Sequence, residues 1–597
     1  MVHDLIIGMA GSGGDGIVSA GESLITAAAA DGYYAILTKS FGSQIRGGES
    51  SCRLRVSTKP VLNPGGTLSV AVILSWDDFL KFGGELPIDG DTIVIYDSKS
   101  GIAPDAIPLQ GVAPVTVLAI PIEDLAMQSA GMLQAKNNLV LGLLAGWFGL
   151  VRKSLLEGIR KRLSKKGDAI LRSNEKAFAA GLDYAEKNPL KVDKVLAAPV
   201  RSLERKLLTD GNEMCATAAI FAGCRFFGGY PITPATEIMQ YLSREIWKYG
   251  GSVLQAEDEI AGIGAVVGAS FAGVKAMTAT SGPGLSLKAE ILGLASIAEL
   301  PLVCVDVQRG GPSTGMPTKK EQSDLFAAVF SSHGDNLRPV LAPISVEDMF
   351  AVTVEAFNIS EHYQTPVIVL SDQEIAQRKE IVNPIDTSKF HLINRHHPAA
   401  KELENYVRFR NTKSGVSPIS HPGMAGGNYL ASGIEHDEMG EPTANGQTHA
   451  RMNTKRFKKL APLKHRDDLF LIEGDEEAPV GVISWGSVGG VALEAVRHAR
   501  AEGIKVKLML PKLLYPVAEE IYQDFFASLR KCIVIEQSHQ GQLHRIIRMS
   551  VAVPDEYLSL AKSGSNPISP LEVYEKIREM ALALQRQLGV GLHPDFG

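Results

Sequence analysis

Residues 230–237 read Tyr-Pro-Ile-Thr-Pro-Ala-Thr-Glu, and the rest of the chain is best understood from this stretch. Its two prolines fix the backbone angle φ and prevent a helix from passing through the segment. Taken alone, the stretch predicts a rigid turn between a strand and a helix. Three further motifs follow in order: Glu257-Asp258-Glu259, Thr280-Ser281-Gly282-Pro283-Gly284 and Gln308-Arg309-Gly310-Gly311-Pro312-Ser313-Thr314-Gly315. The ordered set, rather than any single motif, indicates a ligand site.

Length and composition limit what the chain can be. Its 597 residues are too many for one hydrophobic core, so three or four domains are expected. The formal net charge of -6 argues against nucleic acid as the main partner. The longest apolar run, residues 139–151, is shorter than a membrane span and predicts a buried helix. Residues 1–8 carry no basic leader, so we expect a cytoplasmic protein that is not bound to a membrane.

The cysteines are scattered along the chain and form no C-x-x-C pair; they are Cys52, Cys215, Cys224, Cys304 and Cys532. A structural zinc site or an iron–sulfur cluster needs thiolates that are grouped in sequence. We therefore expect this chain to bind no metal. If the protein transfers electrons, the clusters are expected on another chain.

Apolar strand patterns alternate with helical patterns in three parts of the chain. Alternation of this kind predicts a multi-domain α/β fold with parallel sheets flanked by helices. We predict α/β domains at residues 1–190, 206–378 and 471–597. Residues 379–470 are rich in Pro, Gly, His and Asn and lack a clear period, which predicts an irregular connecting segment that is functional or contacts a partner.

A glycine-rich loop at residues 11–16 satisfies the G-x-G-x-x-G pattern, after a predicted strand and before a predicted helix. Backbone N–H groups in such a loop approach a phosphate, and the helix N-terminus favours its charge. A dinucleotide site also needs an acidic residue after the second strand, where this chain has Lys39, so NAD is disfavoured. Another phosphorylated ligand remains compatible, with Arg46 as a further cation. The alternatives are a tight turn without a ligand and a pairing of Arg46 with Glu49.

Glu257 and Glu259 lie at the predicted start of a small, apolar helix, residues 259–272. The helix dipole explains acidic residues at this place without any ligand. A carboxylate with a catalytic role must also be fixed and partly removed from water, and the N-terminus of a buried helix provides both conditions. A strand that ends in Thr-Ser-Gly-Pro-Gly follows this helix.

This succession resembles the pyrimidine-binding domain of thiamine-diphosphate enzymes, in which a glutamate precedes a glycine-rich helix and a Ser-Gly-Pro-Gly loop. The glutamate of that family hydrogen-bonds the aminopyrimidine ring of the cofactor. The resemblance assigns this role to Glu259, with Glu257 as the alternative. It also implies cofactor contacts from Pro231, Ile232, Ser281 and Gly282.

The full set of motifs resembles the 2-oxoacid:ferredoxin oxidoreductases, and within them the alpha subunit with a gamma domain fused in front. The resemblance covers nearly the whole chain; the central motifs are specific and the flanking ones supportive. It implies a thiamine-diphosphate pyrimidine-binding central domain and a last domain like the transketolase C-terminal domain.

In this family a threonine and an arginine meet the oxo group and the carboxylate of the substrate, and they match Thr233 and Arg309. A guanidinium holds a carboxylate through two hydrogen bonds, and a hydroxyl supports a developing oxyanion. For Arg309, a surface position near Asp306 is the alternative.

The gamma domain of the family lies near bound coenzyme A, so Gly11, Gly13, Gly14, Lys39 and Arg46 become candidates for its phosphates. The magnesium motif of the family, Gly-Asp-Gly with an Asn well downstream, has only partial matches here, at Asp15-Gly16 and Gly334-Asp335-Asn336, and neither has the partner. The resemblance therefore implies a separate beta subunit that carries the cofactor diphosphate, Mg²⁺ and a 4Fe–4S cluster. The expected assembly is a dimer of alpha–beta heterodimers that exchanges electrons with ferredoxin.

A gamma–alpha fusion looks most like the 2-oxoglutarate enzymes, which implies CoA-dependent oxidative decarboxylation of 2-oxoglutarate to succinyl-CoA, with the direction of flux left open. The second substrate carboxylate needs an extra cation, and the candidates are Lys319, Lys320 and Arg338. Two alternatives remain. One is a member of the same family that acts on pyruvate or branched-chain 2-oxoacids. The other is a non-catalytic assembly subunit that binds CoA or a nucleotide.

Overall fold

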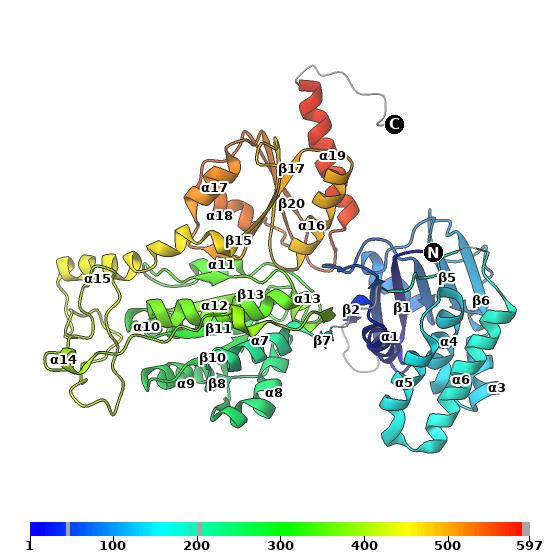
Figure 1. Ribbon diagram of the computed structural model, residues 1–597, viewed down its shortest axis with the longest axis horizontal. Coiled ribbons are helices and arrows are strands. Elements are labelled where there is room, and N and C mark those ends of the chain that lie inside the picture. The colour runs from blue at the N-terminus through cyan, green and yellow to red at the C-terminus, as the bar shows by residue number, and fades with distance from the viewer. Residues whose placement is uncertain (43–47, 192, 200–205, 588–597) are drawn as a thin grey trace. The chain divides into compact units, whose positions relative to one another are not determined.

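The computed structural model describes residues 1–42, 48–191, 193–199 and 206–587. The chain divides into two compact units (Figure 1). The first unit is formed by residues 1–210, 377–385 and 565–569. The second unit is formed by residues 211–376, 386–564 and the chain from 570 onward.

An eight-stranded sheet forms the centre of the first unit. In spatial order its strands are β6 (Thr116–Ile120), β5 (Ile93–Asp97), β4 (Val70–Ile73), β1 (Asp4–Ser12), β3 (Glu49–Ser57), β2 (Tyr34–Phe41), β14 (Lys379–Val382) and β7 (Leu207–Thr209). β1, β4, β5 and β6 are parallel, but β3 is antiparallel to both β1 and β2, and β14 is antiparallel to β2 and β7. The predicted parallel sheet is thus wrong for this unit, because β3 follows β2 along the chain and returns beside it as a hairpin partner.

Two short strands lie in a different part of the fold from the one predicted. β7 was expected in the central domain and β14 in the connecting segment, yet both extend the sheet of the first unit. They pair with each other through Glu380 and Thr209, so the chain leaves this sheet and comes back to it at adjacent positions.

The helices of the first unit pack against both faces of its sheet. They are α1 (Ile17–Asp31), α2 (Trp76–Phe82), α3 (Ile122–Ala130), α4 (Lys136–Phe148), α5 (Arg152–Leu163) and α6 (Asp168–Lys187). The larger core includes α1, α4, α5 and α6, whereas α2 contributes Trp76 and Phe79 to a smaller core. α4 is the buried helix predicted from the apolar run. It crosses α6 so closely that a Cβ on Gly142 would overlap the carbonyl oxygen of Phe178, which explains the glycine.

A seven-stranded sheet in the second unit carries the four sequence motifs. Its order is β18 (Leu513–Tyr515), β12 (Val340–Leu341), β13 (Pro366–Asp372), β11 (Leu302–Gln308), β10 (Ala276–Thr280), β8 (Phe226–Gly229) and β9 (Ser252–Gln255). All neighbours are parallel except β12 and β18. β18 comes from the part of the chain that was predicted to form the last domain, so that part also completes an edge of this sheet.

Helices alternate with the strands of this sheet. They are α7 (Gly211–Phe221), α8 (Thr236–Glu245), α9 (Glu259–Phe271), α10 (Gly282–Ile297), α11 (Leu325–Phe330), α12 (Val346–Tyr363) and α13 (Gln373–Gln377). α7 packs on α12, and α9 packs on α10. This is the layered α/β arrangement that the alternating pattern predicted.

A five-stranded sheet lies in the orange-to-red part of Figure 1. Its order is β15 (Phe470–Gly474), β17 (Val506–Pro511), β16 (Val480–Ser484), β19 (Lys531–Glu536) and β20 (Glu556–Ala561). Only the β15–β17 pair is antiparallel. The helices of this part are α16 (Gly486–Ala501), α17 (Glu519–Phe526), α18 (Gln542–Ser550) and α19 (Pro570–Gln587).

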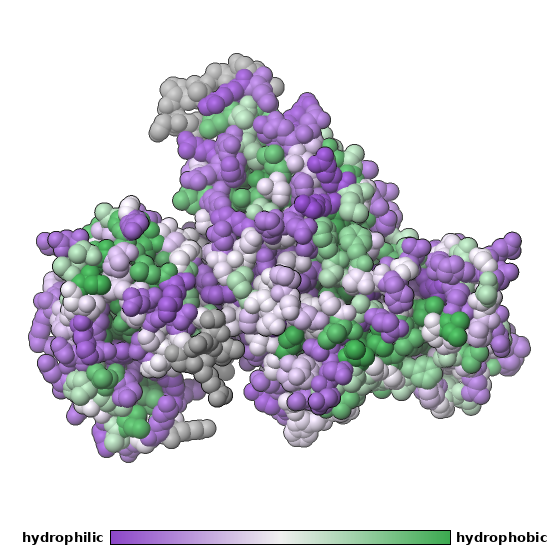
Figure 2. Space-filling view, turned by 180° about the vertical axis from the view of Figure 1, so that it is seen from behind, coloured by the Kyte–Doolittle hydropathy of each residue, from purple (hydrophilic) through white to green (hydrophobic). Residues whose placement is uncertain are grey.

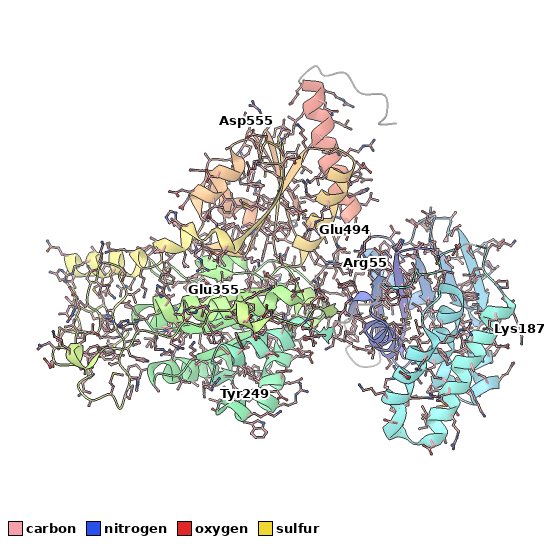
Figure 3. All side chains as sticks on the ribbon, in the orientation of Figure 1. Arg55, Lys187, Tyr249, Glu355, Glu494 and Asp555 are labelled. Atoms are coloured by element: carbon pink, nitrogen blue, oxygen red, sulfur yellow. The ribbon has the colours of Figure 1, made fainter. Side chains whose placement is uncertain are left out.

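The connection between these two sheets has little regular structure. Its α-helices are α14 (Ala400–Leu403) and α15 (Gly446–Lys458). The segment nevertheless makes specific contacts with the central sheet. Arg466 pairs with Glu355 of α12, labelled in Figure 3, at 2.9 Å. Such ion pairs hold an irregular backbone in place, although an exposed pair contributes little free energy by itself.

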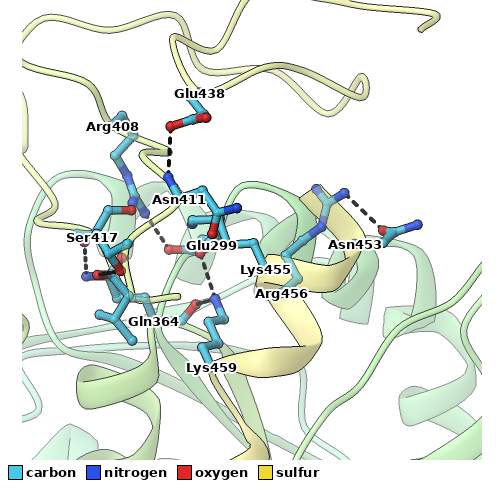
Figure 4. Close-up of polar contacts among 12 residues, drawn as sticks. Glu299, Gln364, Arg408, Asn411, Ser417, Glu438, Asn453, Lys455, Arg456 and Lys459 are labelled. Atoms are coloured by element: carbon cyan, nitrogen blue, oxygen red, sulfur yellow. Dashed lines mark hydrogen bonds and ion pairs between the residues drawn. The ribbon is translucent and has the colours of Figure 1, made fainter. Parts of the chain in front are cut away.

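A buried ion cluster fastens the same segment more firmly (Figure 4). The carboxylate of Glu299, which has no exposed surface, meets the Nζ of Lys455 at 2.5 Å and that of Lys459 at 2.9 Å. Arg408 donates to the backbone carbonyl of Glu299 at 2.7 Å. Burial alone would raise the pKa of Glu299, but the three cations hold it well below its ordinary value. Since a buried carboxylate is tolerated only when paired, these contacts depend on one another.

The surface is of mixed character. On the face shown in Figure 2, hydrophobic and hydrophilic side chains are interspersed. Tyr249, which follows α8 and is 54% exposed, projects outward in Figure 3. Within the part of the chain that the structure describes, no helix has both the length and the apolar character needed to cross a membrane.

Candidate active site

The four motifs meet because the strands that precede them are neighbours. β9, β8, β10 and β11 lie side by side and run parallel. Their carboxyl ends therefore share one edge of the sheet, which is where ligands gather in α/β proteins. Residues 230–237 follow β8, Glu257–Glu259 follow β9, Ser281–Gly284 follow β10 and Arg309–Gly315 follow β11.

Burial separates the two candidate glutamates. Glu259 is the first residue of α9 and only 8% of it is exposed, whereas Glu257 is exposed. Asp258 caps the helix, because its Oδ1 accepts from the N–H of Ala261 at 2.7 Å. The environment that the cofactor role requires is therefore found at Glu259 and not at Glu257.

The side chain of Glu259 faces the Ser-Gly-Pro-Gly loop. A Cβ at Gly284 would lie 3.1 Å from Glu259 Oε1 and 2.9 Å from its Cγ, and would overlap the hydroxyl of Thr280. Glycine at this position is thus a condition for the close approach of the loop to α9. Ser281 and Gly282, two predicted cofactor contacts, belong to the same loop.

Lys288 of α10 belongs to this site, although the motifs did not point to it. Its side chain has no exposed surface, and its Nζ donates to the backbone carbonyl of Glu259 at 2.9 Å. Burial lowers the pKa of this lysine. The sequence did contain a signal, since Leu285, Lys288 and Leu292 have the spacing of one helix face and the lysine stands in the apolar stripe.

Thr233 and Arg309 lie together. The Nη1 of Arg309 donates to the backbone carbonyl of Thr233, and Arg309 is only 7% exposed. Burial lowers the pKa of Arg309, and the charges of Asp324 and Asp306 oppose this. Asn212 of α7 fixes the adjoining turn by donating to the carbonyl of Pro234 at 2.8 Å. The alternative of a surface position for Arg309 is wrong, because the side chain is buried.

The loop after Arg309 turns back on itself. The N–H of Gly310 donates to the carbonyl of Lys319 at 3.0 Å, and the N–H of Met316 donates to the carbonyl of Gly310 at 2.8 Å. This turn brings the backbone of Lys319 and Lys320 close to that of Arg309. The ammonium of Lys320 pairs with Glu374.

Arg338 does not lie at this edge of the sheet. Arg338 comes two residues before Val340 of β12. Val340 and Cys304 of β11 both pair with Ile368 of β13, which lies between them, so Val340 and Cys304 are at the same level in the sheet. Arg338 is therefore level with Leu302, the first residue of β11, and lies seven residues before Arg309 along the strand direction. At about 3.3 Å per residue this is roughly 20 Å. This register places Arg338 near the opposite end of the strands from Arg309 and therefore does not favour a contact between Arg338 and the distal carboxylate.

Several buried polar atoms at the edge have no hydrogen-bond partner within the described chain. They are Ser281 Oγ, both carboxyl oxygens of Asp306, Nε of Arg309 and Oδ2 of Asp324. Such atoms are rare in protein interiors, and their concentration at one place indicates groups that meet a ligand or share protons. The aminopyrimidine half of thiamine diphosphate fits here, because Glu259 offers a fixed carboxylate and Ser281 a free hydroxyl.

The glycine-rich loop of the first unit lies between β1 and α1, as predicted. Gly16 precedes α1 with a φ of 76°, a value that favours glycine. The carboxylate of Asp15 accepts from the N–H of Ser12 at 2.8 Å and pairs with Lys136 at 2.8 Å. One backbone donor of the loop is therefore already engaged by the chain itself.

The predicted cations of this loop are only partly placed. Lys39 pairs with Glu22 of α1 at 2.7 Å. Arg46 lies outside the described residues. A phosphate site formed by Gly11, Gly13 and Gly14 stays a prediction.

Models of one protein family match three parts of the chain. Residues 6–184 match the pyruvate ferredoxin/flavodoxin oxidoreductase model, and residues 217–455 match the thiamine-diphosphate-binding model of pyruvate flavodoxin/ferredoxin oxidoreductases. Residues 478–573 match core domain II of pyruvate:ferredoxin oxidoreductase.

Two relatives support the same assignment. The 2-oxoglutarate synthase subunit KorA of Methanocaldococcus jannaschii is 37% identical over 364 residues, which cover 61% of this chain and 96% of that protein. The chain belongs to the 2-oxoacid:ferredoxin oxidoreductase family. Another family member, the 2-oxoglutarate oxidoreductase subunit KorA of Mycobacterium tuberculosis, is 31% identical over 94% of this chain and 90% of its own length.

A solved structure of the family matches the fold. The 2-oxoglutarate:ferredoxin oxidoreductase from Magnetococcus marinus, with 2-oxoglutarate, coenzyme A and succinyl-CoA bound, is 37% identical with a TM-score of 0.91. The match covers 97% of this chain and 100% of that one. The predicted family and the multi-domain α/β fold class are thereby confirmed, with mixed rather than wholly parallel sheets.

Proposed function

We propose that this chain is the alpha subunit of a 2-oxoglutarate:ferredoxin oxidoreductase, with a gamma domain at residues 1–190 fused in front. The reaction converts 2-oxoglutarate and coenzyme A into succinyl-CoA and carbon dioxide, and passes two electrons to ferredoxin, one at a time. The substrates bound by the M. marinus relative support this choice. The fusion is supported by the relatives' coverage, since the M. jannaschii protein matches 61% of the chain and the M. tuberculosis protein 94%.

The observation that carries the proposal is the meeting of Glu259, Thr233 and Arg309 at one edge of the central sheet. Glu259, buried at the start of α9, would hold the aminopyrimidine ring of thiamine diphosphate, with Pro231, Ile232, Ser281 and Gly282 around it. When bound, that cofactor supplies the nucleophilic carbon and the electron sink for decarboxylation. The protein's own contribution is to fix, orient and desolvate the reacting groups.

Arg309 and Thr233 are assigned to the substrate. The guanidinium of Arg309 binds the carboxylate next to the 2-oxo group through paired hydrogen bonds. The hydroxyl of Thr233 donates to the 2-oxo oxygen as negative charge develops on it. Because Arg309 is buried, its charge acts in a medium of low dielectric constant and is screened weakly by water.

The distal carboxylate of 2-oxoglutarate needs another cation. Lys319 and Lys320 return beside Arg309, so we assign the contact to this pair of lysines and no longer to Arg338. Replacement of Lys319 by Met is expected to raise the KM for 2-oxoglutarate while leaving that for pyruvate unchanged.

The proposal includes a separate beta subunit. The Gly-Asp-Gly triplet of this chain, Gly14-Asp15-Gly16, lies in the glycine loop of the first unit, where Asp15 pairs with Lys136, and the five cysteines are scattered. All five are buried and free. We therefore assign Mg²⁺, the diphosphate contacts and a 4Fe–4S cluster to the partner, in a dimer of alpha–beta heterodimers. A cytoplasmic location and coenzyme A contacts near the glycine loop are parts of the same proposal.

Reduction of a low-potential dye by the chain co-purified with its beta partner tests the function. Rapid, CoA-dependent reduction with 2-oxoglutarate alone is the expected result. A preference for pyruvate or branched-chain 2-oxoacids would keep the reaction and change the substrate. No reduction with any 2-oxoacid, by a complex that holds cofactor and cluster, would favour the non-catalytic assembly subunit.

A further inference from the structure

Two carboxyl groups lie behind Arg309 and have no part in the proposed reaction; Asp306 is fully buried and Asp324 is partly buried, with its Oδ2 atom shielded from water. Asp306, three residues earlier on β11, has no exposed surface, and neither of its carboxyl oxygens has a hydrogen-bond partner in the described part of the chain. Asp324 lies in the loop that leads into α11. Its carboxyl group rests against Gly282, where a Cβ would be 2.7 Å from Oδ2.

Glutamine side chains hold Asp324 at this place. The Oε1 of Gln308, on β11, accepts from the N–H of Asp324 at 3.0 Å. Gln542 of α18 accepts from the N–H of Phe326 at 2.8 Å and donates to the carbonyl of Ser323 at 2.7 Å. The backbone of the loop is thus fixed on both sides of Asp324, whose Oδ2 atom is shielded from water.

The two acids differ in how well they tolerate a negative charge. Asp306 lies within a strand and receives no hydrogen bond, so a charge there would be uncompensated. Asp324 lies at the N-terminus of α10, a helix of 16 residues whose dipole favours a negative charge. Asp306 is therefore the group that keeps a proton, and Asp324 is the one that can lose it.

The titration behaviour agrees with this geometry. Burial first, and then the charge of Asp324, raises the pKa of Asp306 well above its ordinary value, while Arg309 opposes the shift. Burial and Glu321 raise the pKa of Asp324 to about 7, again against Arg309. Two like charges in one buried site cannot both persist, a pattern known from paired catalytic aspartates.

The other titratable groups on the surrounding elements have hydrogen-bond or ion-pair partners of their own, although the charge of Glu321 also acts on Asp324. Glu321 accepts from the N–H groups of Gly311 and Gly564, Lys320 pairs with Glu374, and Asp372 accepts from the N–H of Ser487. Glu536 accepts from the N–H of Leu543, and Lys288 donates to the carbonyl of Glu259. The carboxylate of Glu259 faces the other side of the Ser-Gly-Pro-Gly loop and is assigned to the cofactor.

We propose that Asp306 stays protonated behind Arg309 while Asp324 gains and loses a proton, and that loss of the proton from Asp324 weakens binding of the substrate carboxylate. The inference rests on the proposed function, in which Arg309 binds that carboxylate. When Asp324 is neutral, the guanidinium charge is balanced by the substrate. When Asp324 is ionised, it balances Arg309 first, and an incoming carboxylate meets a second negative charge. Binding of a 2-oxoacid is therefore coupled to uptake of a proton by Asp324.

The pH dependence of KM in the assembled enzyme tests the coupling. The KM for 2-oxoglutarate is expected to be constant below about pH 6 and to rise by up to about tenfold per unit above about pH 7. Asp324→Asn carries a neutral amide of the same shape, so its KM is expected to stay low and constant to about pH 8.5. Asp306→Asn is the matched control, because it replaces an acid that is already neutral, and should keep the rise. A KM that rises equally in Asp324→Asn would overturn the coupling.

A second measurement does not depend on turnover. Infrared difference spectra between the unaltered complex and each variant detect the carbonyl stretch of a protonated carboxyl group. Asp306→Asn should remove a band that persists at about pH 8, and Asp324→Asn a band that disappears between about pH 6 and about pH 8. Absence of both bands would overturn the assignment of protonated carboxyl groups to Asp306 and Asp324. Both bands in a complex that oxidises no 2-oxoacid would instead overturn the proposed function, and with it the link to a substrate, while the protonation of the two acids would stand.

Discussion

The Nζ of Lys288 lies 2.9 Å from the backbone carbonyl oxygen of Glu259. A lysine without exposed surface thus fixes the first turn of the helix that carries the candidate cofactor glutamate. Burying an ammonium group costs free energy, and a single hydrogen bond returns only part of it. This lysine therefore contributes to the position of Glu259 rather than to the stability of α10.

Lys288→Met is therefore expected to separate stability from activity. The free energy of unfolding should change by less than about 1 kcal/mol, because loss of the hydrogen bond is offset by removal of a buried charge. The turnover number should fall about tenfold, which corresponds to about 1.4 kcal/mol, since Glu259 is held less firmly. Urea unfolding and dye reduction on the same preparation check both parts. Unchanged turnover would mean that Lys288 does not position Glu259.

Glu259→Gln is expected to lower the turnover number by a factor of about 100 to 10,000, the range for loss of a group that moves a proton. The amide has the same shape as the carboxylate but cannot take over its charge. Glu257→Gln is the matched control, and its exposed side chain predicts turnover within about twofold of the unaltered enzyme. Equal losses in the two variants would remove the distinction between these glutamates.

Gly284→Ala is expected to destabilise the chain by about 1 to 3 kcal/mol, because the new Cβ overlaps Thr280 and presses on Glu259. Gly264→Ala on α9 is the control. No atom lies within 4 Å of its added Cβ, so a gain of about 0.5 to 1 kcal/mol from helix propensity is expected. Denaturant unfolding of the two variants should shift in opposite directions. A stable Gly284→Ala would show that the loop can retreat from α9.

Arg309→Lys keeps the charge and loses the planar fork. We expect kcat/KM for the 2-oxoacid to fall about 100-fold, or about 2.7 kcal/mol, because an ammonium cannot donate two parallel hydrogen bonds to a carboxylate and also reach the carbonyl of Thr233. Steady-state kinetics with saturating coenzyme A measure the effect. A lysine variant with normal kcat/KM would imply that only the charge matters.

Glu299→Gln is expected to destabilise the chain by about 3 to 5 kcal/mol, because it leaves two buried lysines without their carboxylate. The pKa of Glu299 is lower in the folded protein than in the unfolded chain. Its stabilisation is therefore present above the unfolded pKa and is lost as the pH falls through the folded pKa. Urea unfolding at neutral pH measures the loss. A triple variant with methionine at Glu299, Lys455 and Lys459 should recover most of it, and failure to do so would point to a role other than charge pairing.

The sequence located the site better than it ranked the residues within it. The order of the motifs was sufficient because each follows a strand, and neighbouring parallel strands end at the same edge. The resemblance favoured Glu259, but the residues alone left Glu257 open, since both are near the start of one helix and only the burial of Glu259 against Gly284 distinguishes them. Arg338 could not be placed from the sequence, because a basic residue before a strand and one after a strand look alike until the register is known.

Other features could not be predicted from the sequence pattern, each for a different reason. β7 and β14 are too short for their period to be recognised, and their partners are distant in sequence. Lys288 is an exception to the rule that lysines are solvated, so its burial contradicts the usual interpretation of a polar residue on a helix. The pairing of Asp306 with Asp324 depends on a loop whose position is set by Gln308 and Gln542.

The pairing of β14 with β2 and β7 has a consequence for any attempt to divide this gene. A fragment that ends at residue 190 would contain β2 but neither of the strands that follow it in the sheet. The eight-residue edge of β2 would then present unpaired N–H and C=O groups, a known template for aggregation. A separately encoded polypeptide of this type must protect that edge by other means. In this chain β14, which follows the central sheet in sequence, pairs with β2 and covers the edge.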